Sequence, residues 1–174
     1  QLGFVPLRLY SDVPGAWIPV WLTPLTATLA HGGWLHLGMN LLLLFWCSRE
    51  VERVLGPVSV VVLYIIGAYF AAAGQYVPDP MSQIPMVGAS GAISALVGAF
   101  ALSFSRPKPI VRNFRFNRAL NTLWILVAWV ILQWMTGLLM GMSGIAVATG
   151  AHVGGFIAGV LFQKPLLLWR YRKA

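Results

Sequence analysis

Apolar residues occupy five stretches of this chain, each long enough to cross a lipid bilayer. They cover residues 34–54, 58–77, 86–105, 119–140 and 144–168, and short polar or proline-containing segments separate them. A helix that crosses the hydrocarbon core needs about 20 apolar residues. Only internal backbone pairing satisfies the peptide groups where water is absent. The pattern therefore predicts an all-α, polytopic membrane helix bundle with five spans.

Residues 1–33 do not continue this pattern, because four prolines interrupt them. Their tryptophans, Trp17 and Trp21, are typical of segments that lie at a membrane–water interface. We therefore expect two regions. Residues 1–33 form an external loop with interfacial segments, and residues 34–174 form the transmembrane helical core.

The composition supports a membrane protein, since 59% of the residues are hydrophobic and only 9% are charged. Soluble domains carry about 25% charged residues. The net charge of +8 does not indicate nucleic-acid binding, because the basic residues flank apolar stretches. Eleven of the twelve lie at the end of the first stretch, between the third and fourth stretches, or near the chain end, and Arg8 is the other. The positive-inside rule then predicts a cytoplasmic C-terminus and an external segment 1–33.

Ser90 and His152 lie inside apolar stretches, where polar side chains are costly and usually functional. The first, third and fifth spans run in the same direction, so depth can be compared at about 1.5 Å per residue. On that scale Asn40, Ser90 and His152 lie about 9, 7 and 12 Å below one surface. Similar depth on three helices predicts a single site.

The residue types at this site indicate acyl-transfer chemistry. A serine hydroxyl becomes a useful nucleophile when a neighbouring base accepts its proton, and His152 can be that base. All four acidic residues lie in loops or at the interfacial ends of apolar stretches, so we expect a Ser-His dyad rather than a triad with a carboxylate. Asn40, His36 and the Ser90 backbone N–H are the candidate donors to a tetrahedral oxyanion.

A stripe of small residues on the fifth span, Ala151, Gly155 and Gly159, predicts close packing against the third span. That approach would bring Ser90 to His152. His31 and His36 are five residues apart and no H-E-x-x-H sequence occurs, so we expect no metal site. We also expect no cofactor.

Each of these polar residues, taken alone, is more often structural. A lone Ser90 would usually be a small packing residue, and a lone Asn40 or His36 an interhelical hydrogen bond. Their combination at matched depth favours catalysis. A transporter or channel is disfavoured, because the inner halves of the spans are almost wholly apolar.

The motifs resemble those of the rhomboid family of intramembrane serine proteases. They are an H-x-x-x-x-H-x-x-x-N pattern, a V-E-x-x-L-G exit, a G-A-S-G turn and a glycine-rich A-H-V-G-G helix, at residues 31–40, 51–56, 88–91 and 151–159. The resemblance implies Ser90 as nucleophile, His152 as general base, and His36 and Asn40 as oxyanion donors. It implies substrates that are transmembrane helices of other membrane proteins, cut near a small residue at an unstable helix end. It also implies a multi-pass protein, which we expect in a bacterial or archaeal cell membrane.

This chain departs from the family pattern in two places. The family core has six helices, and this chain matches helices two to six, with residues 1–33 corresponding to the long loop after the first. Bacterial relatives often carry a tyrosine four residues after the serine, packed on the histidine, where this chain has Ser94. The alternative function is a catalytically inactive, rhomboid-like protein that binds membrane helices, although a binder needs neither Ser90 nor His152.

Overall fold

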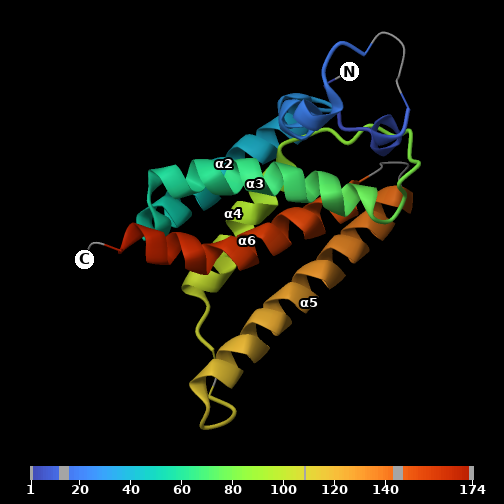
Figure 1. The fold of residues 1–174 in the computed structure, drawn as a ribbon. Helices are drawn as coiled ribbons and strands as arrows, with labels where there is room; N and C mark the ends of the chain where they lie inside the picture. Colours follow the sequence, from blue (N-terminus) through green and yellow to red (C-terminus); the bar gives the residue numbers. More distant parts are fainter. Residues whose placement is uncertain (1, 12–15, 108, 143–146, 173–174) are drawn as a thin grey trace.

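The computed structural model describes residues 2–11, 16–107, 109–142 and 147–172. Within these residues the five predicted stretches form five long helices (Figure 1). These are α2 (Trp34–Leu55), α3 (Pro57–Tyr76), α4 (Ser90–Phe104), α5 (Phe114–Met142) and α6 (Thr149–Arg170). No strand forms in the described residues. The predicted all-α membrane bundle is therefore confirmed.

Helices α3, α5 and α6 are both long and apolar enough to span a membrane. Helix α2 is long enough, but its last turns carry charged residues such as Glu50 and Arg53. Helix α4 is apolar but has only 15 residues. At 1.5 Å per residue it is about 22 Å long, which is shorter than the hydrocarbon core of about 30 Å.

The third stretch differs from the prediction, which placed the start of the span at residue 86. The helix begins at Ser90, because the backbone before it cannot continue a helix. Gly88 has a φ of 108°, outside the range that other residues adopt easily and outside the right-handed helical region. Ser90 is therefore the first residue of a short helix rather than a position inside a longer one.

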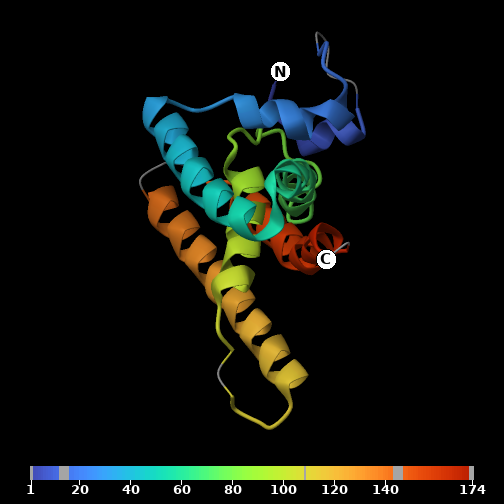
Figure 2. The same cartoon turned by 90° about the vertical axis from the view of Figure 1, so that its left-hand side faces the viewer.

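Helix α4 lies at the centre of the bundle, packed against α6, α3 and α2 (Figure 2). Its contact with α6 is a backbone-to-backbone approach. A Cβ atom placed on Gly155 would overlap the Gly91 carbonyl oxygen, and one on Gly159 would overlap the Ala95 carbonyl oxygen. The structure thus places both predicted packing glycines in the α4–α6 interface.

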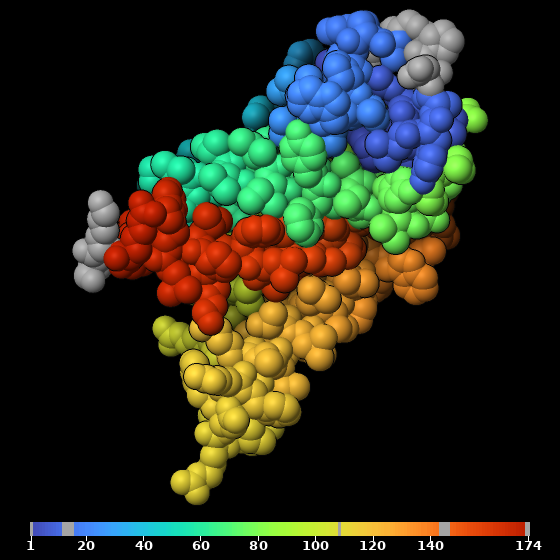
Figure 3. All heavy atoms as spheres, viewed as in Figure 1, coloured from blue at the N-terminus to red at the C-terminus, as the bar shows by residue number. Residues whose placement is uncertain are grey.

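A cluster of buried side chains from α2, α3 and α4 lies toward the C-terminal end of α4. Its members are Val51, Leu55, Leu63, Leu96 and Ala99, each at most 1% exposed. Helix α5 differs, since it packs chiefly on α6 and presents many large apolar side chains outward. Its first half projects away from the rest of the molecule (Figure 3).

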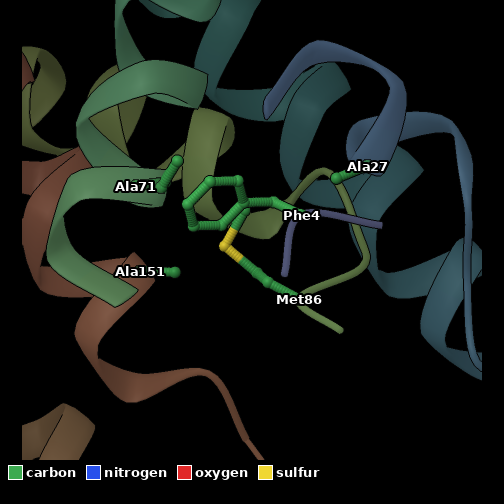
Figure 4. Close-up of a cluster of buried hydrophobic side chains, with 6 residues drawn as sticks. Phe4, Ala27, Ala71, Met86 and Ala151 are labelled. Atoms are coloured by element: carbon green, nitrogen blue, oxygen red, sulfur yellow. The ribbon is translucent and has the colours of Figure 1, made fainter. Parts of the chain in front are cut away.

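The N-terminal segment lies across the end of the bundle where α4 and α6 begin. It contains the short helices η1 (Pro6–Leu9), η2 (Val20–Leu22), α1 (Thr23–Thr26) and η3 (Ala27–Leu29). Phe4 and Met86 exchange backbone hydrogen bonds of 3.0 and 2.8 Å. Their side chains pack with Ala27, Ala71 and Ala151 (Figure 4). This packing holds the loop that leads into α4.

Replacing Gly159 by Ala should lower the midpoint of thermal unfolding in detergent. The added methyl group must push α6 away from α4, and overpacking of this kind typically costs about 1–3 kcal/mol. Gly38→Ala is the matched control, because a Cβ atom on Gly38 meets nothing within 4 Å. Both substitutions gain the same helix propensity, so equal effects on the midpoint would contradict the close-packing account.

Candidate functional site

Ser90 and His152 meet at the end of the bundle where α4 and α6 begin. Ser90 is the first residue of α4, and His152 lies in the first turn of α6. The His152 Nε2 atom is 2.7 Å from the Ser90 Oγ atom, a normal length for a hydrogen bond. Both residues are half-buried. The close approach at Gly155, about one turn after His152, makes this short distance possible.

The start of α4 also presents unpaired backbone donors. The first N–H groups of any α-helix have no partner within that helix. In α4 the earliest backbone donor to find a carbonyl is Ile93, which donates to Ala89. The N–H groups of Ser90 and Gly91 therefore have no acceptor within α4, and the positive end of the helix dipole lies beside the Ser90 hydroxyl.

The other side of the His152 ring contacts Gln133 of α5. The Gln133 Oε1 atom is 2.7 Å from the His152 Nδ1 atom, and Gln133 is only 8% exposed. Gln133 was not among the predicted site residues, because a carboxylate is the usual third member of such a site. The available signal was an amide side chain within the apolar stretch 119–140, where a polar group is costly.

Trp129 of α5 makes a second contact with His152. Its indole N–H donates to the His152 backbone carbonyl at 3.3 Å. Its ring stacks on Phe156, with centroids 4.8 Å apart. Ser94, one turn after Ser90, donates its hydroxyl to the Ser90 carbonyl at 2.8 Å. The Ser94 side chain thus bonds within its own helix, while α5 supplies partners for His152.

His36 and Asn40 lie on one face of α2, as predicted from their spacing. The His36 Nδ1 atom accepts a hydrogen bond from the Gly32 N–H at 3.3 Å. A neutral imidazole that accepts at Nδ1 carries its proton on Nε2. Asn40 is buried, and its amide nitrogen donates to the His36 carbonyl at 3.0 Å.

Gly88 connects this pair to the serine. A Cβ atom on Gly88 would lie 2.7 Å from the His36 Nε2 atom and 3.7 Å from the Asn40 Nδ2 atom. The His36 ring edge therefore touches the backbone two residues before Ser90. The Gly88 N–H donates to the Ala27 carbonyl at 2.9 Å, which fixes this turn against the N-terminal segment.

The described part of the chain contains no group of three or more His, Cys, Asp or Glu side chains that could hold a metal ion. His31 packs edge-on to His36, with ring centroids 5.1 Å apart.

Most of this chain resembles known proteins. The model of the Rhomboid domain family matches residues 19–169. RHOMBOID-like protein 5 of Arabidopsis thaliana is 29% identical over 139 residues, which cover 79% of this chain and 41% of that protein. Rhomboid protease GlpG of Yersinia enterocolitica is 29% identical over 132 residues, which cover 75% of this chain and 43% of that protein. The chain thus spans less than half the length of these relatives.

Proposed function

This chain belongs to the rhomboid family, and we propose that it is an intramembrane serine endopeptidase that cuts transmembrane helices of other membrane proteins. The observation that carries the proposal is the 2.7 Å contact between Ser90 Oγ and His152 Nε2. The relative named as a rhomboid protease supports the same activity. The chain is an integral membrane protein, and its proposed substrates would reach the site through the bilayer.

In the proposed mechanism the Ser90 oxygen attacks the scissile carbonyl carbon while His152 Nε2 accepts the hydroxyl proton. The tetrahedral intermediate collapses to an acyl-enzyme, and His152 transfers the proton to the leaving amine. A water molecule then attacks the ester with His152 again acting as base. Collapse of the second intermediate releases the new carboxyl end and returns the proton to Ser90.

Three donors are proposed to stabilise the oxyanion: the Ser90 backbone N–H, the His36 ring and the Asn40 amide. The Gly32 N–H supports this role, because it occupies His36 Nδ1 and leaves Nε2–H as the donor. One amide hydrogen of Asn40 bonds to the His36 carbonyl, and the second is available. Such donors contribute most where charge develops in the transition state.

The short length of α4 supports a site below the membrane surface. If the C-terminal end of α4 lies at one interface, a helix of about 22 Å starts about 8 Å below the other surface of a core of about 30 Å. Non-helical backbone at that depth is tolerated where protein buries it or where it lines a water-filled cavity. The turn before Ser90 would then give water access, which hydrolysis requires.

The basic residues support a cytoplasmic C-terminus, which would place the site in the outer half of the membrane. Residues 1–33 would then be the external loop, and the bundle from residue 34 the catalytic region. The relatives come from both a plant and bacteria. A bacterial or archaeal origin therefore stays a prediction.

Ser90→Ala should abolish cleavage of a model transmembrane substrate and labelling by a fluorophosphonate probe. The substitution removes the nucleophile and little packing volume, so the unfolding midpoint should hardly change. Ser94→Ala is the matched control on the same helix, since the Ser94 hydroxyl bonds only to its own backbone in the described residues. Cleavage by purified Ser90→Ala protein at the wild-type rate would refute the assignment. Wild-type protein that binds membrane helices without cutting or labelling would favour the inactive binder.

Asn40→Ala and His36→Ala should each lower kcat and leave KM nearly unchanged. Donors to an oxyanion act in the transition state, and loss of one typically costs about 10²–10³ in kcat. The loss should be smaller where the remaining donors compensate. A purely structural role predicts an unchanged kcat and a stability loss near the average of about 0.6 kcal/mol for a membrane interhelical hydrogen bond. Kinetics and thermal unfolding on the same variants distinguish the two roles.

A further inference from the structure

We propose that Gln133 on α5 is a positioning residue that holds His152 in the tautomer required of a general base. The candidate site would then contain a Ser-His-Gln triad with a neutral third member, rather than a dyad. This inference rests on the proposed protease function. It goes beyond it by assigning a role to a residue on a helix that contributes neither the nucleophile nor the base.

The Gln133 side-chain carbonyl oxygen can only accept a hydrogen bond. With the amide oxygen 2.7 Å from His152 Nδ1, this contact is a hydrogen bond when the ring proton is on Nδ1. A neutral imidazole has one such proton, so Nε2 carries a lone pair. That lone pair faces the Ser90 hydroxyl at 2.7 Å and can accept its proton. The opposite tautomer would direct an N–H at Ser90 and could not act as base.

The location of Gln133 supports a specific role. The side chain is 8% exposed although most of α5 is exposed along its length. A polar group in a membrane helix is costly unless it finds a partner, and the contact of Gln133 is with the base. An amide supplies the acceptor without placing a net charge in the bilayer, whereas a carboxylate would add one.

A second contact keeps this geometry in place. Trp129 lies one turn before Gln133 and donates to the His152 backbone carbonyl at 3.3 Å. Its stacking on Phe156 fixes the same face of α5 against α6. His152 is thus held from α5 at both its ring and its backbone, so the tautomer depends on α5 being packed on α6.

Gln133→Met tests the role, because methionine has a similar length and no strong acceptor. We expect kcat to fall about tenfold or more with KM unchanged, as for loss of one hydrogen bond that matters in the transition state. Gln133→Glu keeps an acceptor oxygen at the same position and should restore part of the lost kcat.

Gln163→Met is the matched control. Gln163 on α6 is 3% exposed, and its amide nitrogen donates to Ser103 Oγ at 3.2 Å, away from the proposed catalytic residues. Both methionine variants lose one buried amide hydrogen bond, at His152 in one case and at Ser103 in the other. Only Gln133→Met should lower kcat. Equal kcat values for wild type and Gln133→Met would overturn the inference and leave the proposed function intact.

The tautomer can also be measured without any cleavage assay. Imidazole ¹⁵N chemical shifts, with the His152 signals assigned by comparison with His152→Ala, should show protonated Nδ1 in the wild type. In Gln133→Met they should show a mixture of tautomers. Protonated Nε2 in the wild type, or the same tautomer in both proteins, would overturn the inference. An inactive wild type would refute the proposed function, while the chemical shifts would still decide what Gln133 does.

Discussion

The close approach of α6 to α4 is the contact on which the rest of the site depends. Gly155 and Gly159 let the α6 backbone lie directly against the carbonyl groups of Gly91 and Ala95. Lipid tails are as apolar as leucine, so burial from lipid does little to drive membrane helices together. Van der Waals packing of small residues holds such helices. This contact brings the His152 ring within hydrogen-bond distance of Ser90.

The polar groups around this contact are connected rather than isolated. The Gln133 oxygen lies 2.7 Å from one ring nitrogen of His152, and the Ser90 hydroxyl lies 2.7 Å from the other. His36 and Asn40 form a separate pair that touches the chain at Gly88. In hydrocarbon an unpaired polar group is expensive. Pairing therefore stabilises the side chains and also fixes their orientation, which is what catalysis would need.

The irregular backbone before Ser90 is also held in place by hydrogen bonds to another part of the chain. A helix that continued from residue 86 would leave no positive-φ turn at Gly88 and would extend α4 toward the membrane surface. The observed turn is held by the N-terminal segment, through the Phe4–Met86 backbone pair and the Ala27 carbonyl. The prolines that prevent residues 1–33 from forming a span are thus compatible with a segment that packs over the end of the bundle where α4 and α6 begin.

Much of this arrangement was predictable from the sequence, because the bilayer imposes strict rules on it. Apolar stretches that cross a bilayer must form helices, because only a helix pairs its own backbone groups. Ser90 and His152 were predicted to be functional, because polar side chains inside a membrane are costly. The glycine stripe indicated which helices approach closely. The start of α4 was wrong by four residues, because hydropathy does not register the backbone turn at Gly88. Gln133 was missed because its role depends on which face of α5 packs against α6.

The sequence by itself determined the membrane class, the helices and the residue types available for chemistry. These follow from local hydropathy and from the cost of polar groups in lipid. Only the tertiary structure decided which atoms meet: His152 Nε2 with Ser90, Nδ1 with Gln133, and the His36 ring with Gly88. Distances of this kind depend on how four helices pack and rotate against one another. That packing sums many weak contacts between residues far apart in the chain, and no local pattern records the result.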